Sequence, residues 1–216
     1  MKEKQPVSHI LSALPFWLSL GILPCVWLSG TYGGWTLLVG ILYGWVILPL
    51  LDVVLGLNRD NPSTDTPEQD LFWYRLITLI WAPIQACVLY GAIWWMTHTD
   101  HLALWEKLYF FVGVGVMTGA VGIVYAHELM HQKNRTERWL ADILLAMVLY
   151  SHFRTEHLLV HHRYVATPRD AVSARYNEGF HVFFLRVLKE SPPSAWRAEC
   201  QLLARAGRGK FHRSNP

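Results

Sequence analysis

The chain has 216 residues, a mass of 24.9 kDa and a formal net charge of +3. Its apolar residues gather in long runs almost free of charge, and this excludes an ordinary soluble domain. The basic residues form no patch interleaved with aromatic side chains, so nothing indicates nucleic-acid binding. Two of the three cysteines fall inside apolar runs, so neither a disulfide framework nor a thiolate metal site is indicated.

Four apolar runs predict four transmembrane helices, because each is close to the roughly 20 residues that a helix needs to cross a bilayer. They cover residues 10–29, 35–57, 76–97 and 108–126. Residues 30–34 should join the first two helices as a tight hairpin. The first run is too long for a cleaved signal peptide and lacks a cleavage site of small residues. We therefore expect an all-α integral membrane protein whose residues 1–126 form the transmembrane part.

The placement of Lys and Arg predicts the orientation of these helices. Of the 19 basic residues, 18 fall on one side of a four-helix arrangement, and only Lys107 falls on the other. Basic residues are retained on the cytoplasmic side of a membrane. Residues 127–216, a histidine-rich region with a basic C-terminal segment, should therefore be cytoplasmic, and the protein should be in contact with membrane lipid.

Asp52 lies about one turn from the cytoplasmic end of the second predicted helix. A carboxylate at that depth is costly unless it is paired or wetted, so we expect a functional role with a partner on a neighbouring helix. The alternative is an end residue whose side chain reaches the membrane surface. The polar, proline-containing stretch 58–69 is predicted to be a linker.

The string HELMH places His127 and His131 just after the fourth apolar run. Their i, i+4 spacing puts both imidazoles on one face of a helix, which is typical of a metal site. We expect the fourth helix to continue into the cytoplasm and carry both histidines. A single HExxH string also arises by chance, so this pair alone decides little.

A second histidine box, SHFRTEHLLVHH, covers residues 151–162. His157 and His161 repeat the i, i+4 spacing, and His162 is adjacent. Between the boxes, the apolar run 139–153 is short for a crossing and predicts an interfacial or re-entrant helix that returns the second box to the first. Further on, we expect a helix over residues 194–206, after Pro192 and Pro193.

Five imidazoles in two boxes exceed the three or four ligands that one zinc ion needs, and this indicates more than one metal ion. Imidazole suits iron, copper or zinc, and the membrane setting favours oxidation of an apolar compound by activated oxygen. His152 is either an outer donor or an interfacial residue. The remaining histidines have no partner at metal-site spacing: His9, His98, His101, His181 and His212.

The strings HELMHQK and YSHFRTEHLLVHHRYVATPRDAVSAR resemble the first two histidine boxes of the membrane-bound alkane 1-monooxygenases, within the fatty acid desaturase and hydroxylase superfamily. The box EHxxxHH followed by VATPxD separates this group from the desaturases. Asp52 in PLLDVVLG, with the Asn-Pro loop that follows, also resembles the second span of that family.

The resemblance implies a non-haem di-iron centre held almost wholly by histidine. Such an enzyme uses O2, and electrons from rubredoxin and its reductase, to hydroxylate the terminal carbon of an alkane or a similar lipophilic hydrocarbon. The iron ligands carried onto this chain are His127, His131, His157, His161 and His162. Candidates for the outer shell that orients them are Glu128, Glu156, Asp170, His152 and Asp52, of which Glu128 and Glu156 are alternatively plain helix-face residues.

The resemblance is incomplete, because that family has two more spans and a further group of histidines after the second box. From this we expect a truncated product, a single incomplete domain that is inactive alone. Two alternatives stay open. One is an intramembrane zinc protease with His127 and His131 as ligands and Glu128 as general base, which leaves the second box unexplained. The other is a non-catalytic remnant without redox-active iron.

Overall fold

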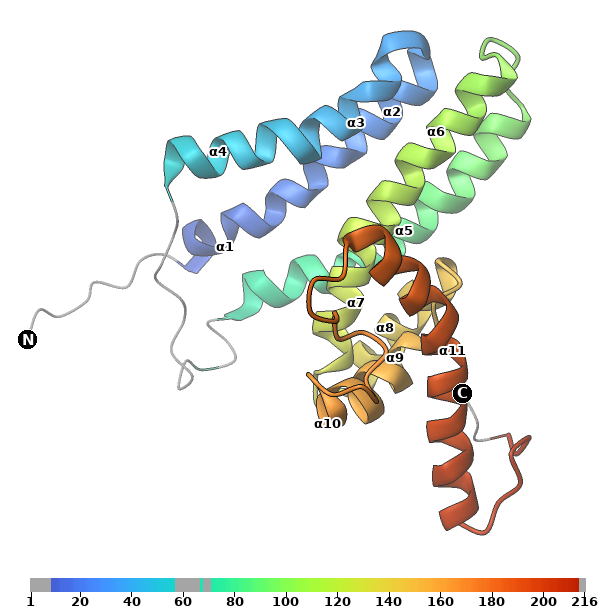
Figure 1. Cartoon of the computed structure of the whole chain (residues 1–216). Helices are drawn as coiled ribbons and strands as arrows, with labels where there is room; N and C mark the ends of the chain where they lie inside the picture. The colour runs from blue at the N-terminus through green and yellow to red at the C-terminus, as the bar shows by residue number, and fades with distance from the viewer. Residues whose placement is uncertain (1–8, 57–66, 68–70, 214–216) are drawn as a thin grey trace, which may run out of the picture. The chain divides into compact units, whose positions relative to one another are not determined.

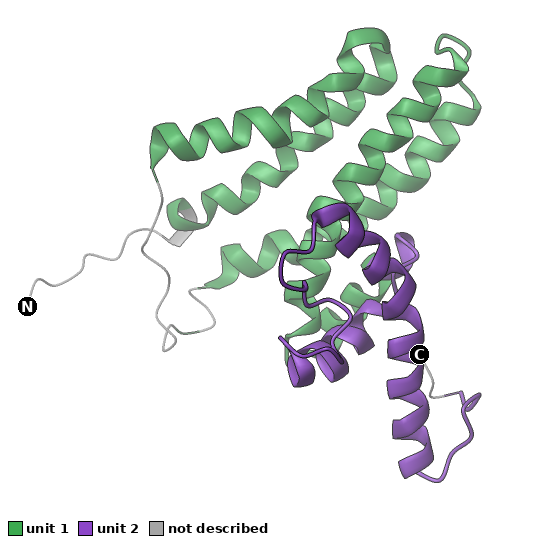
Figure 2. Ribbon diagram, viewed as in Figure 1, with its two compact units in different colours: residues 1–144 green, residues 145–216 purple. Residues whose placement is uncertain are grey.

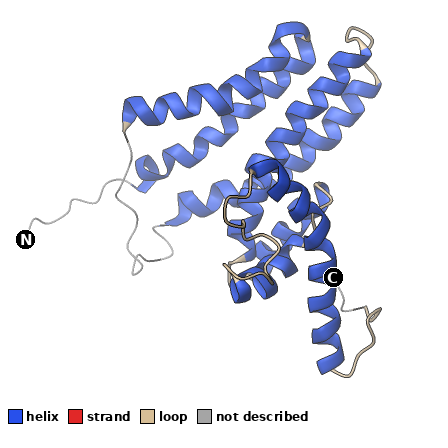
Figure 3. Ribbon diagram, in the orientation of Figure 1, coloured by secondary structure: helices blue, strands red, loops and turns tan. Residues whose placement is uncertain are grey.

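A computed structural model describes residues 9–56, 67 and 71–213. All regular secondary structure in these ranges is helical, which confirms the predicted all-α class (Figure 3). The chain divides into two compact units, residues 1–144 and residues 145–216 (Figure 2). The first unit contains the apolar helices and the first histidine pair, and the second contains the second histidine box.

Four helices in the described part of the first unit are long and apolar enough to cross a membrane, so the four predicted spans are confirmed. They run over Leu11–Tyr32, Gly34–Leu55, Phe72–Thr97 and Leu104–Met130. The predicted linker 30–34 is too long, since Gly33 alone separates the first two helices. The predicted linker 58–69 lies outside the described residues apart from Pro67.

The first two spans form an antiparallel hairpin of several helical segments (Figure 1). The first span comprises α1 (His9–Trp17), a 3-10 turn (Leu18–Gly21) and α2 (Ile22–Tyr32). The second span begins with a 3-10 turn (Gly34–Leu38) and continues through α3 (Val39–Leu42), a π-helical turn (Tyr43–Ile47) and α4 (Leu48–Leu55). Gly33 turns the chain with φ +59°, and a Cβ there would lie 2.5 Å from Leu102 Cδ2. Only glycine fits this position without strain.

The second pair of spans packs around a buried aromatic cluster. It comprises α5 (Phe72–Thr97) and a continuous helix made of α6 (Leu104–Val116), a π-helical turn (Met117–Gly122) and α7 (Ile123–Met130). Trp81 is fully buried, donates its indole N–H to Gln85 Oε1 at 3.0 Å, and packs edge-on against the Tyr125 ring. The Tyr125 hydroxyl lies 2.7 Å from Ser19 Oγ. Polar contacts of this kind between membrane helices contribute about 0.6–2 kcal/mol each.

Helix α8 (Arg135–Met147) follows the first histidine pair, and an ion pair between Arg75 and the buried Glu137 fixes it to the start of α5. A helix predicted over 139–153 is present as α8, but it starts earlier, at Arg135, and ends earlier, at Met147. Leu149 takes the left-handed conformation, with φ 56°, and Tyr150 N donates to Leu145 O at 2.9 Å, which closes the helix.

The second unit packs one long helix against a short helical stretch that carries the second histidine box. The stretch consists of α9 (Phe153–Thr155), a π-helical turn (Glu156–His161) and α10 (His162–Tyr164); the long helix is α11 (Phe180–Arg205). Thr155 Oγ1 donates to Glu199 Oε1 of α11 at 2.6 Å. Buried Val187 and Ala195 lie on α11, on either side of its two prolines.

The predicted helix 194–206 begins too late, because α11 starts at Phe180 and continues through Pro192 and Pro193. Prolines inside a helix remove backbone donors and bend it rather than end it when packing holds both halves. Figure 1 shows such a bend along α11.

Arg186 of α11 orders the loop that leads into this helix. Its guanidinium donates to Ala171 O at 2.6 Å, to Ser173 O at 3.0 Å, and through two nitrogens to the carboxylate of Glu178 at 2.8 and 2.6 Å. These bonds fix the segment directly after Asp170, a residue of the candidate site.

Candidate metal centre

The first histidine pair lies at the C-terminal end of α7. His127 is in the last turn of the helix and His131 follows its last residue, with their ring centroids 4.7 Å apart. The i, i+4 spacing therefore brings these two rings together. Glu128 Oε1 lies 3.4 Å from His127 Nδ1, and the Glu128 side chain is 60% exposed. A hydrogen bond this long to an exposed carboxylate orients the imidazole weakly.

The second histidine box is built on the π-helical turn, and its tightest pair is not the predicted one. His162 Nε2 lies 3.0 Å from Nε2 of the buried His157. These residues are five positions apart, because a π-helical turn closes i to i+5 and places such residues over one another. The predicted i, i+4 pair also lies together, with the His161 ring stacked on that of His157 at 5.3 Å between centroids, although the turn is π-helical rather than α-helical.

Asp170 holds the third imidazole of this box. Its Oδ2 lies 2.8 Å from His161 Nδ1, while the Ser173 hydroxyl and the Val172 amide donate to the same carboxylate. Burial raises the pKa of Asp170, but these hydrogen bonds outweigh burial and leave the pKa below its ordinary value. The charged carboxylate keeps the His161 proton on Nδ1, so that Nε2 is free to bind a metal.

Glu156 is buried and His152 is half-buried beside this box, without such bonds among the described residues. Both carboxylate oxygens of Glu156 lack a hydrogen-bond partner within the described ranges, and its side chain is fully buried. Burial, and then the charge of Asp170, raise the Glu156 pKa to about 7. His152 Nε2 is also buried without a described partner, and burial lowers the His152 pKa. Among the described residues, neither the Glu156 carboxylate nor His152 Nε2 forms a hydrogen bond with a histidine of the boxes, so their roles as outer partners stay predictions.

Asp52 lies on α4 with an exposed side chain. Within the described ranges no side chain pairs with it, so the expected partner on a neighbouring helix is not seen.

The side chains of the second box fit a metal ion. Two nitrogen ligands about 2.1 Å from one metal, at angles of about 90–110°, lie roughly 3.0–3.4 Å apart. The 3.0 Å between the two Nε2 atoms of His157 and His162 falls in this range. Glu156 belongs to the same π-helical turn, and its buried carboxylate oxygens have no hydrogen-bond partner among the described residues. Imidazole with carboxylate suits iron or zinc.

Residues 102–216 match the family model described as Fatty acid desaturase, a segment that contains both histidine boxes. The chain belongs to the fatty acid desaturase family. Among curated relatives, this desaturase-family protein is 32% identical to Alkane 1-monooxygenase 2 of Pseudomonas aeruginosa over 94% of the chain and 52% of the relative. It is 34% identical to Alkane 1-monooxygenase 1 of Alcanivorax borkumensis over 95% of the chain and 50% of the relative. It is 33% identical to Alkane 1-monooxygenase of Pseudomonas putida over 99% of the chain and 52% of the relative. The chain spans about half the length of these curated relatives.

Proposed function

We propose that this multi-pass membrane protein acts in a monooxygenase with a non-haem di-iron centre, which hydroxylates the terminal carbon of an alkane or a similar lipophilic hydrocarbon. The observation that carries the proposal is the convergence of His157 Nε2 and His162 Nε2 at 3.0 Å, inside the segment that matches the desaturase family. Relatives named alkane 1-monooxygenases support the choice of reaction.

The proposed ligands are His127 and His131 from the first unit and His157, His161 and His162 from the second. That the two sets serve one centre rests on the family resemblance. Each residue of the set offers an imidazole nitrogen, and Asp170 fixes the tautomer of His161 through Nδ1. The Ser173 hydroxyl and the Val172 amide donate hydrogen bonds to the Asp170 carboxylate, and the Arg186 guanidinium donates one to the Ser173 carbonyl oxygen. This chain of contacts keeps one ligand in a fixed orientation.

When bound, the iron would supply the activation of dioxygen. The overall reaction balances as R–H + O2 + 2 e⁻ + 2 H⁺ → R–OH + H2O, so a donor of two electrons is needed. We propose rubredoxin with its reductase as that donor, as the family resemblance implies. We also propose that the histidine boxes lie on the cytoplasmic side of a bacterial inner membrane, since 18 of the 19 basic residues fall on the side that holds both boxes.

The activity test uses a fusion protein that contains the part of the relatives that this chain does not span. The chain is fused to the C-terminal half of the Pseudomonas putida relative, loaded with iron, and given rubredoxin, its reductase and octane. We expect 1-octanol, and loss of at least nine-tenths of it in His161→Ala.

A matched Glu128→Gln variant of the fusion separates this proposal from a zinc protease. The exposed Glu128 contacts His127 only weakly, so its loss should leave most of the octanol formation. If Glu128→Gln abolished all activity while His161→Ala kept it, the general base of an HExxH protease would explain the result and the proposal would fail.

A further inference from the structure

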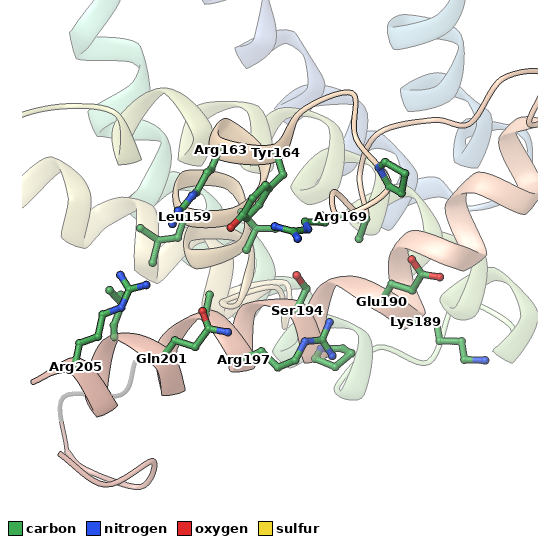
Figure 4. Close-up of a pocket in the computed structure, with 16 residues that line it drawn as sticks. Leu159, Arg163, Tyr164, Arg169, Lys189, Glu190, Ser194, Arg197, Gln201 and Arg205 are labelled. Atoms are coloured by element: carbon green, nitrogen blue, oxygen red, sulfur yellow. The ribbon is translucent and has the colours of Figure 1, made fainter. Parts of the chain in front are cut away.

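A groove of about 700 Å³ lies within the second unit, between residues 159–171 and one face of α11 (Figure 4). Among the described residues that line it, none is a histidine. Its charged lining residues are the basic Arg163, Arg169, Lys189, Arg197 and Arg205 and the acidic Glu190. The groove is therefore a strongly basic concavity separate from the ligand set proposed above.

One wall of the groove holds two guanidinium groups on a single aromatic ring. Arg163 lies 5.2 Å and Arg169 lies 5.6 Å from the centroid of the Tyr164 ring. Contacts of this length are favourable cation–π interactions. They keep both positive charges at this wall of the groove, where they attract an anion.

The opposite wall is one face of α11. Ser194, Arg197, Gln201 and Arg205 follow one another at spacings of three or four residues, so they share that face. Arg197 and Arg205 are separated by about 12 Å along the helix axis. Figure 4 shows Arg205 and Gln201 rising from α11 towards the other wall, whereas Lys189 points away from the groove.

The carboxylates around the groove are already engaged. Glu190 lies 3.8 Å from Arg186, and Asp170 accepts hydrogen bonds from Ser173 and His161. Glu199 accepts the hydroxyl of Thr155. Within the described part of the chain, none of the four groove arginines forms an ion pair. Among the described residues, Glu190 is the one carboxylate that lines the groove, beside five basic side chains, so its lining is strongly basic.

We propose that this groove binds a phosphate group, carried either by the headgroup of an anionic phospholipid or by a free phosphate ester. The guanidinium group donates two parallel hydrogen bonds that match phosphate oxygens. The volume of about 700 Å³ is that of a small-ligand pocket, and a concave site of this size suits a headgroup better than the surface of a folded acidic protein. The proposal does not depend on the function proposed above.

The test uses the full 216-residue chain in an uncharged detergent. Calorimetry at constant ionic strength measures binding of inorganic phosphate and of glycerol phosphate. Native mass spectrometry counts retained phosphatidylglycerol, with phosphatidylcholine as the neutral reference. Saturable binding of the soluble phosphates assigns the groove to free phosphate esters, and retention of phosphatidylglycerol alone assigns it to the lipid headgroup.

Two variants remove charge from opposite walls, so that a folding failure of one leaves the other. These are Arg163→Gln with Arg169→Gln, and Arg197→Gln with Arg205→Gln. Each should weaken binding at least tenfold with unchanged helical content. The matched control, Lys210→Gln with Arg213→Gln, removes two charges from the same unit outside the groove and should change binding less than twofold.

Three results would overturn the proposal. The first is an equal loss in the control, which would mean that only net charge attracts the ligand. The second is no binding of any phosphate compound by the parent chain. The third is groove-dependent binding of an acidic polypeptide such as polyglutamate without binding of phosphate.

Discussion

The Nε2 atoms of His157 and His162 face one another at 3.0 Å across a single π-helical turn, although the residues are five positions apart. Two imidazole nitrogens at this separation share at most one proton, whereas a metal ion accepts the lone pairs of both. The π-helical turn is thus the local structure on which the second half of the proposed centre depends.

We therefore expect His157→Ala and His162→Ala each to lower the affinity of the chain for Fe²⁺ at least tenfold, because each removes one of two convergent donors. The measurement is equilibrium binding of Fe²⁺ under anaerobic conditions. His181→Ala is the matched control, since His181 is an exposed histidine of the same unit. Equal losses in all three variants would show that histidine content, not this pair, determines the affinity.

Asp170→Asn should lower the Fe²⁺ affinity about 10–100-fold, the usual effect of losing an outer partner of a metal-bound histidine. The amide is uncharged and no longer fixes the proton on His161 Nδ1. Ser173→Ala, which removes one donor to Asp170 but keeps the carboxylate, should cause a smaller loss. If Asp170→Asn bound iron as well as the parent chain, Asp170 would hold only the loop.

The sequence predicted the membrane helices well, because long uncharged runs leave few alternatives. The observed ends of these helices differ from the predicted ones for local reasons. At Gly33, the positive φ and the nearby Leu102 side chain require a glycine, and this single residue reverses the chain. The first histidine pair also followed from its spacing, since α7 is an ordinary α-helix at His127.

The second histidine box was harder to predict, because nothing in EHLLVHH distinguishes a π-helical turn from an α-helical one. Two other features oppose the conformational preferences of their residues and depend on tertiary packing. Leu149 takes a left-handed conformation, and α11 continues through Pro192 and Pro193. The role of Asp170 as partner of His161 could be proposed from the family, but not its bonds from Ser173 and Val172.

The ion pair of Glu178 with Arg186 predicts how the second unit responds to acid. The Arg186 hydrogen bonds, followed by the Arg175 amide, lower the pKa of Glu178 to about 2 from an ordinary value of 4.5. A carboxyl group with a lowered pKa stabilises the folded state at pH values above its ordinary pKa of 4.5. This stabilisation is lost as the pH falls from 4.5 towards 2. Hydrogen exchange of peptides from residues 171–186 should therefore show protection at pH 6 that fades by pH 3.

The control for this prediction is Glu178→Gln, compared with the parent chain at each pH. The two should differ most at pH 6 and converge at low pH, since protonated glutamate and glutamine are both uncharged. A difference that persists unchanged to pH 3 would contradict the assigned pKa.

The placement of basic residues predicts the topology. Reporter fusions after Lys133 should read cytoplasmic and a fusion after Asp100 should read periplasmic, because Lys107 is the only basic residue on the Asp100 side. A periplasmic signal from the Lys133 fusion would reverse the arrangement and would remove the histidine boxes from the cytoplasmic side.

The stoichiometry of bound metal tests the di-iron proposal most directly. The purified fusion with the C-terminal half of the Pseudomonas putida relative is titrated anaerobically with Fe²⁺, in the presence and absence of Zn²⁺. Metal per chain is counted after ultrafiltration, and the His127→Ala and His161→Ala variants of the fusion are measured in parallel. We predict saturation at two irons per chain, with lower occupancy in both variants. Saturation by one zinc ion that is insensitive to His161→Ala, or no stoichiometric metal at all, would contradict a di-iron centre in this protein.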